Sequence, residues 1–126
     1  MTKYLFIIIA FLTFAIPCQA GNTVNHVGNV IEISAIDSDW TWTDTLPERS
    51  DGIKVKSIQF NPGAADDVLV IEEASASGPR SVYFKCADTT VQKTKYFDDV
   101  KIKPFLDESD CTLSEGATVI IIFTYR

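Results

Sequence analysis

The sequence contains few of the side chains that carry acid–base chemistry or hold transition metals. Its 126 residues include a single histidine, His26, and three cysteines. A Ser/His/Asp triad would have to use His26, and no nucleophile-elbow motif occurs in the chain. The cysteine spacings match no zinc motif. We therefore expect a non-enzymatic protein without a cofactor, in which His26 is a solvated side chain.

Basic residues are also scarce relative to acidic ones. The chain has 11 Lys and Arg against 17 Asp and Glu, for a formal net charge of −6. Nucleic-acid binding requires clustered Lys and Arg, so this composition argues against a nucleic-acid partner. Six lysines alternate with other residues in the predicted strands, which is typical of the solvated face of a sheet: Lys54, Lys56, Lys93, Lys95, Lys101 and Lys103.

No apolar run is long enough to cross a bilayer. The longest, Tyr4–Ile16, has about thirteen residues, whereas a membrane span needs roughly twenty. Lys3 precedes this run, and residues 1–20 together have the features of a secretory signal peptide. We expect a secreted or periplasmic protein, with a single domain at 21–126 and no stable membrane span after cleavage. A retained N-terminal anchor and lipidation at Cys18 are the alternatives.

After residue 20 the sequence has no helical periodicity, and Gly and Pro residues separate short apolar segments. The clearest pattern is Ile53–Ala87, where three extended segments are separated by two turn clusters. We interpret this stretch as a β-meander that supplies half of one core. With the remaining short segments it makes roughly six to eight strands, which predicts an all-β fold, an antiparallel β-sandwich or jelly roll.

Two details of the meander can be predicted from its alternation. The apolar residues of Ile53–Phe60 start on one phase and switch to the other at Ile58. Because strand side chains alternate between faces, a β-bulge near Lys56–Ser57 or a break in the strand must absorb the switch. Val68–Ile71 is apolar on both faces, which predicts a strand that is covered on both sides.

Four further strands are predicted outside the meander, one of them at Val100–Lys103, which alternates before Pro104 ends it. Val27–Ser34 alternates and is expected to be the first strand, and a short strand is expected at Trp40–Thr43 within a long connection. Val119–Tyr125 is the most apolar strand after the leader. At a sheet edge its free N–H and C=O groups would be a template for pairing with another subunit. Burial in the centre of the sandwich is the alternative.

Two cysteines, Cys86 and Cys111, remain after the leader. In an oxidising compartment such a pair predicts a disulfide, which would close a loop of about 25 residues. Two buried free thiols, which behave as small apolar side chains, are the alternative.

Two pairs of residues are candidates for ligand binding. Trp40 and Trp42 would share one face of an extended segment and form a platform for a sugar ring or a protein ligand. A core-capping aromatic cluster is the alternative.

Asp37 and Asp39 are the candidate ligands of a calcium site, but no acidic group in the chain fits the twelve-residue calcium loop. Solvated loop carboxylates explain the acidic groups equally well.

The segments Gly52–Ile71, Lys95-Tyr96-Phe97 and Ile102–Asp107 carry a resemblance to a known class of proteins. In them the chain resembles small β-sandwich structural proteins of tailed bacteriophage particles. The resemblance is one of general style and covers over half of the chain after the leader. It implies a structural, non-enzymatic role in an assembled particle, and it carries over no functional residue.

The leading hypothesis is therefore an exported β-sandwich subunit that self-associates. It would form a homo-oligomer, filament or particle, in an extracellular or virion-like setting. The competing hypothesis is a monomeric secreted binding module that uses Trp40 and Trp42 for a carbohydrate or protein ligand. A small periplasmic enzyme or inhibitor is a third hypothesis.

Overall fold

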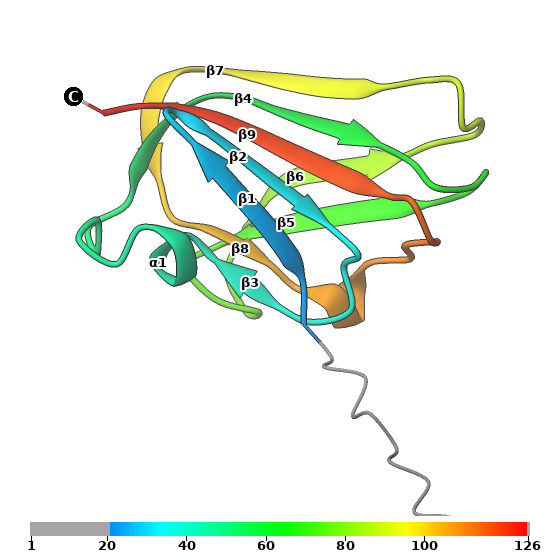
Figure 1. The fold of residues 1–126 in the computed structure, drawn as a ribbon, viewed down its shortest axis with the longest axis horizontal. Helices are drawn as coiled ribbons and strands as arrows, with labels where there is room; N and C mark the ends of the chain where they lie inside the picture. The colour runs from blue at the N-terminus through cyan, green and yellow to red at the C-terminus, as the bar shows by residue number, and fades with distance from the viewer. Residues whose placement is uncertain (1–20, 126) are drawn as a thin grey trace, which may run out of the picture.

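Residues 21–125 form two antiparallel β-sheets stacked face to face, joined by loops and short helical turns (Figure 1). The structure, a computed structural model, describes residues 21–125. The predicted signal peptide and Cys18 lie outside these residues. The prediction of an all-β fold is confirmed, and the two stacked layers have the arrangement of a β-sandwich.

One layer has five strands and the other has four. The five-stranded sheet has the order β1 (Thr23–Val27), β2 (Val30–Ser34), β9 (Thr118–Thr124), β4 (Ile53–Asn61) and β7 (Lys93–Ile102). The four-stranded sheet has the order β3 (Trp40–Thr41), β8 (Pro104–Leu106), β5 (Val68–Glu73) and β6 (Arg80–Lys85). Two helical turns, α1 (Trp42–Thr45) and the 3-10 turn η1 (Glu108–Asp110), lie in the connections.

The core lies between the two sheets and is made from alternate residues of their strands. In β9 every second residue is buried, which is the pattern of a strand with one face on the core and the other outside. The largest fully buried side chains between the sheets come from both layers: Ile31, Ile33, Val55, Ile58, Phe60, Ile121 and Phe123 from one, and Trp40, Leu69, Ile71 and Leu106 from the other.

The predicted bulge is confirmed at the predicted place. The pairing of β4 with both of its neighbours shifts register between Val55 and Ser57. The shift lets Val55 and Ile58 both point into the core, although they are three positions apart. A change of apolar phase in the sequence thus corresponds to one inserted residue in the strand.

The prediction that β5 is covered on both sides is also confirmed. Leu69 and Ile71 face the core, whereas Val70 lies on the opposite face and is still buried. The cover comes from the segment that follows β8, where the Cys111 thiol accepts a hydrogen bond from the Val70 amide at 3.2 Å.

The prediction of a single first strand at Val27–Ser34 is wrong. This region is the second half of a hairpin, in which β1 pairs with β2 through the two-residue turn Gly28-Asn29. Gly28 has a φ of 58°, a conformation that glycine adopts without steric cost. Because the apolar residues alternate on both sides of the turn, the sequence pattern does not reveal the turn.

The most apolar strand lies in the centre of its sheet. β9 pairs with β2 on one side and with β4 on the other, so its backbone groups are used within the chain. Pairing of Val119–Tyr125 with another subunit is therefore not possible in this fold. Among residues 21–125, no helix is long and apolar enough to cross a membrane.

Candidate functional site

The two indoles proposed as a ligand platform lie inside the molecule. Trp40 is 2% exposed and Trp42 is 7% exposed, and both belong to the hydrophobic core. Their ring nitrogens are also occupied. Trp40 Nε1 donates to Thr45 Oγ1 at 3.1 Å, and Trp42 Nε1 donates to the Arg49 carbonyl at 2.6 Å. Buried rings have no free face for a sugar, so these residues are core anchors.

A local change of backbone explains why the pair does not form a platform. The strand β3 ends at Thr41, and this residue begins α1 as its N-cap. The Thr41 hydroxyl accepts the Thr43 amide, and the Asp44 carboxylate accepts the Thr41 amide, which makes a capping box. The T-x-x-D pattern was visible in the sequence as a helix start. The two indoles therefore extend from different elements.

The predicted disulfide is absent from the structure. Cys86 and Cys111 are both free thiols, one fully buried and the other partly buried. Burial raises the pKa of the Cys86 thiol, and burial also raises the pKa of Cys111 to about 11. Both side chains act as small apolar groups in the packing, which is the alternative that the sequence left open.

The proposed calcium ligands Asp37 and Asp39 are exposed and perform structural roles. The Asp37 amide donates to Asn22 Oδ1 at 3.0 Å, and Asp39 Oδ1 accepts the Glu108 amide at 2.9 Å. These bonds join the β2–β3 connection to Asn22, which directly precedes β1, and to η1. Within residues 21–125, Asp37 and Asp39 do not belong to a group of three converging metal-ligating side chains.

A different set of carboxylates does converge. Oxygen atoms of Glu72, Asp107 and Asp110 all lie within 4.8 Å of one another. Glu72 is 4% exposed and Asp107 is 5% exposed, whereas Asp110 is at the surface. Two carboxylates that are almost completely buried beside a third are uncommon, because charged groups lose hydration when they are buried.

The register of the four-stranded sheet produces this convergence. Ile71 of β5 pairs with Leu106 of β8, and both point into the core. Glu72 is the next residue of β5, and Asp107 directly follows the end of β8, so both side chains point to the outer face. There the turn η1 contacts β5 and carries Asp110 over them. The sequence showed the acidic run around Asp107, but nothing in it linked Glu72 to that run.

The three carboxylates affect one another electrostatically. Burial raises the pKa of Glu72, and the neighbouring charges of Asp107 and Asp110 raise it further, while Arg80 lowers it. Arg80 is opposite Glu72 in the β5–β6 register, and its guanidinium is 3.8 Å from Asp110 Oδ2. This ion pair is about half exposed on both sides, so it balances only part of the negative charge.

The described surface also has a hollow at the end of the sandwich. It has a volume of about 450 Å³ and lies between the β2–β3 connection, at Ala35–Asp37, and the segment Leu113–Gly116 before β9. The one hydroxyl lining this hollow belongs to Ser114, and it donates to the Asp67 carboxylate rather than to a histidine. His26 does not line the hollow; it lies in β1, with its Nε2 bonded to the Gly28 carbonyl at 2.8 Å.

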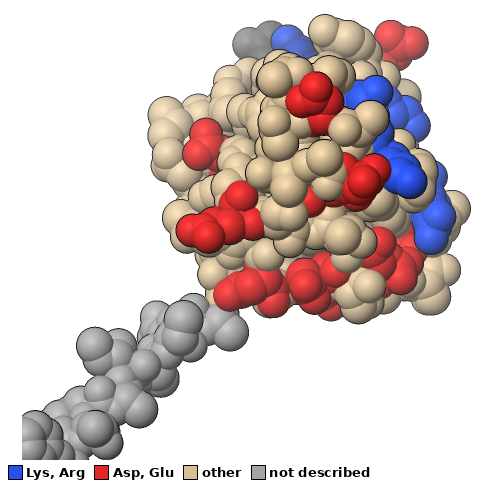
Figure 2. All heavy atoms as spheres, turned by 90° about the vertical axis from the view of Figure 1, so that its right-hand side faces the viewer, with Lys and Arg blue, Asp and Glu red and all other residues tan. Residues whose placement is uncertain are grey.

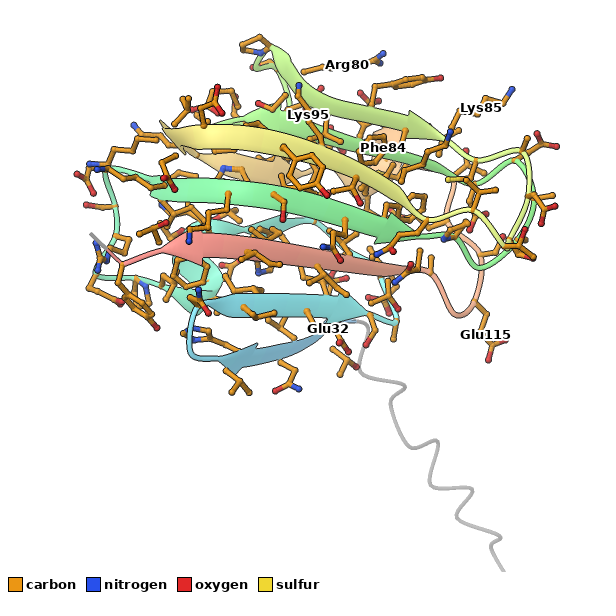
Figure 3. The ribbon with its side chains drawn as sticks, turned by 90° about the horizontal axis from the view of Figure 1, so that it is seen from above. Glu32, Arg80, Phe84, Lys85, Lys95 and Glu115 are labelled. Carbon is orange, nitrogen blue, oxygen red and sulfur yellow. The ribbon has the colours of Figure 1, made fainter. Side chains whose placement is uncertain are left out.

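The four strands at the sheet edges differ in how well they are protected against pairing with another chain. β7 and β6 carry lysine or arginine and border register shifts, and β3 has only two residues. Lys95 of β7 also reaches across to the Ser81 carbonyl of β6, where Figure 3 shows it between the two strands. These are the features by which β proteins block edge-to-edge association.

The remaining edge strand, β1, has none of these protections. Its sequence, Thr-Val-Asn-His-Val, contains no lysine, arginine, acidic residue or proline, and it pairs with β2 without a register shift. All five residues are exposed, including Val24 at 37% and Val27 at 68%. The apolar pattern of the sequence does not indicate this surface, because the turn of the hairpin lies within an alternating stretch.

The structure thus describes an all-β, two-sheet protein with a cluster of buried carboxylates on one sheet and an unprotected edge on the other. Comparison of the chain with protein-family models, curated proteins and solved structures found no match. What the molecule does must therefore be inferred from its own residues.

Proposed function

We propose that the protein is a structural subunit that self-associates through the edge strand β1. The observation that carries this proposal is the contrast between β1 and the other three edges. In an antiparallel ladder the N–H and C=O groups of every second residue point away from the partner strand. Along β1 these groups face outward from an uncharged and fully exposed strand. A second copy of β1 can pair with them by strand addition.

The outer face of the same sheet supports an extended contact. The register places Val27, Val30, Ile122, Ser57 and Tyr96 in one row that crosses all five strands. Both ends of the row are open to solvent, with Val27 at 68% and Tyr96 at 80% exposure. Antiparallel pairing of the two β1 strands would place the outer faces of the two sheets side by side in one continuous surface. That surface would be available for packing in a larger assembly.

The order of the strands supports a jelly-roll class for this subunit. Apart from the hairpin β5-β6, the neighbours in these orders are distant in the chain: β2-β9-β4-β7 in one sheet and β3-β8-β5-β6 in the other. This is the pairing expected when two Greek keys are folded over each other. Jelly rolls occur in capsid and lectin domains, so the class is compatible with assembly.

The setting of the assembly belongs to the same proposal. The features of residues 1–20 favour export, and the resemblance to phage β-sandwich proteins favours a particle. We propose an extracellular or virion-like assembly of identical copies, without a catalytic role. Figure 2, which views one end of the sandwich, shows Asp and Glu spread over the face and Lys and Arg along one side. This distribution is compatible with copies of the chain as partners rather than nucleic acid.

The proposal can be tested with two matched lysine substitutions. Asn25 of β1, Glu32, Ile120, Gln59 and Thr94 of β7 form one row across the sheet. Asn25→Lys places a charge on the unprotected edge, opposite Glu32 of β2, where Figure 3 labels this carboxylate. The cross-strand pair with Glu32 keeps the fold stable. Thr94→Lys places the same charge at the other end of the row, on the edge that is already protected.

We expect Asn25→Lys to shift the protein toward the monomer and Thr94→Lys to leave the assembly unchanged. Circular dichroism and thermal unfolding confirm that both variants keep the fold. If Asn25→Lys leaves assembly intact while Thr94→Lys disrupts it, the contact lies at β7 and the proposal fails.

A further inference from the structure

We propose that Glu72, Asp107 and Asp110 form a binding site for a hard divalent cation of the Ca²⁺ class. The site would connect β5 to the turn η1 on the outer face of the four-stranded sheet. It lies on a different sheet from β1, and it does not depend on the proposed self-association.

The first observation is the convergence of the three carboxylates within 4.8 Å. Carboxylate oxygens are the ligands that hard cations such as Ca²⁺ prefer. The group contains neither imidazole nor thiolate, which disfavours zinc and copper. Three charged ligands with the remaining positions filled by water correspond to a site of moderate affinity, with a Kd on the order of 10⁻⁴–10⁻³ M as in extracellular calcium modules.

The second observation is an unsatisfied oxygen inside the group. Glu72 is only 4% exposed, and its Oε2 atom has no hydrogen-bond partner among residues 21–125. A buried carboxylate oxygen without a donor is unfavourable, because it has lost its hydration and gained nothing in return. A cation bound between Glu72 and its two neighbours would supply the missing interaction and would also offset their mutual repulsion.

The basic residue nearest to the group does not fill this role. The Arg80 guanidinium is 3.8 Å from Asp110 Oδ2 at the exposed side of the cluster. It also lies over the ring of Tyr83, with its central carbon 5.6 Å from the ring centroid. One half-exposed positive charge faces three carboxylates, of which two are buried. The negative charge of the two buried carboxylates, Glu72 and Asp107, is therefore not balanced by Arg80.

The turn that carries the ligands is held in shape by its own hydrogen bonds. Asp107 Oδ1 accepts the Ser109 amide at 3.1 Å and the Ser109 hydroxyl at 2.6 Å, as the N-cap of η1. The Asp110 amide in turn donates to the Asp107 carbonyl at 3.2 Å. These bonds fix Asp107 and Asp110 relative to each other, so a cation would bind to a largely preformed site.

The test is calcium titration of the full chain after treatment with EDTA and dialysis. We expect a saturable binding heat with one ion per chain and a rise in melting temperature with added CaCl₂. At a hundredfold excess over Kd, binding should increase the folding equilibrium constant about a hundredfold. Glu72→Gln keeps the size of the side chain and removes its charge, and it should weaken calcium binding at least tenfold.

Two further variants make the result specific. Glu108→Gln, in the same turn but outside the converging group, should bind calcium as the wild type does. Asp110→Asn changes an exposed ligand and should weaken binding without unfolding the protein, even if Glu72→Gln proves too unstable to purify. Equal loss in Asp110→Asn and Glu108→Gln would indicate a general charge effect and would overturn the site.

The proposal also fails if Ca²⁺, Mg²⁺ and Mn²⁺ all leave the melting temperature and the calorimetric trace unchanged. In that case Glu72 is held as a neutral carboxylic acid, and Glu72→Gln would be as stable as the wild type. Because β1 plays no part in this experiment, a negative result leaves the proposed self-association standing, and the converse also holds.

Discussion

The hydroxyl of Ser114 donates a 2.7 Å hydrogen bond to Asp67 Oδ1, across 47 positions of the chain. Asp67 is 1% exposed, and its Oδ2 accepts the amides of Gly63, Ala64 and Ser114. One carboxylate thus ties the β4–β5 turn to the segment that leads into β9. A Cβ at Gly63 would lie 2.7 Å from the Ser114 carbonyl oxygen, so the two segments approach as closely as glycine permits.

Asp67→Ala should therefore destabilise the protein by about 3 kcal/mol, because three amides and a hydroxyl lose a charged acceptor in a buried place. Urea unfolding followed by circular dichroism measures the change. Glu115→Ala is the control, since Glu115 is exposed at the neighbouring loop position, where Figure 3 shows it pointing outward. This control should stay within about 0.5 kcal/mol of the wild type. Equal effects of the two substitutions would contradict the role of Asp67.

The same carboxylate should make the fold sensitive to acid. Burial of Asp67 raises its pKa, but the hydrogen bonds from Ser114, Gly63 and Ala64 outweigh burial and hold the pKa below the ordinary value. A lowered folded-state pKa contributes stability that is fully present above the unfolded-state pKa, near 3.9, and is lost as pH falls through the folded-state value. Stability measured from pH 6 down to pH 2 should fall less steeply below about pH 4 in Asp67→Ala. Identical slopes for the two proteins would show that Asp67 has no such role.

Truncation of the indoles should test their assignment to the core. Trp40→Ala is expected to cost about 3–5 kcal/mol, because the side chain is fully buried and its removal leaves a cavity. Tyr96→Ala is the matched control, since this aromatic ring on β7 is 80% exposed. Thermal unfolding should show a large loss for Trp40→Ala and little change for the control. An unchanged melting temperature for Trp40→Ala would restore the indole as a candidate binding residue.

The free cysteines should be unreactive in the folded protein. Burial protects Cys86, and the pKa of Cys111, raised to about 11, leaves little thiolate near neutral pH. Treatment with iodoacetamide at pH 8 should leave the native protein unmodified, and both thiols should react after denaturation. Intact mass spectrometry measures the number of added groups. Failure of denatured, unreduced protein to react at Cys86 and Cys111 would reveal a disulfide.

The fold was predictable where the relevant signal is local. The change of apolar phase within Ile53–Phe60 required a bulge, and the structure has one between Val55 and Ser57. The apolar character of Val68–Ile71 on both faces required cover on both sides, and the connection after β8 supplies it. In both cases the prediction depends only on the pattern of side chains within one strand.

The candidate sites depend on contacts between distant parts of the chain, and these were not predictable. Glu72 meets Asp107 only because β5 pairs with β8, a pairing that the sequence does not specify. The exposed edge exists because the turn at Gly28-Asn29 divides an alternating stretch into two strands. The indoles failed as a platform for a local reason, the helix start at Thr41, which the T-x-x-D pattern could have indicated.

The native mass of the protein in solution tests the central claim most directly. Light scattering over a hundredfold range of concentration should show the wild type and Thr94→Lys as dimers or larger species that build up with concentration. Asn25→Lys should keep the mass of one chain over the same range. A wild-type protein that remains a monomer at every concentration would contradict self-association through β1.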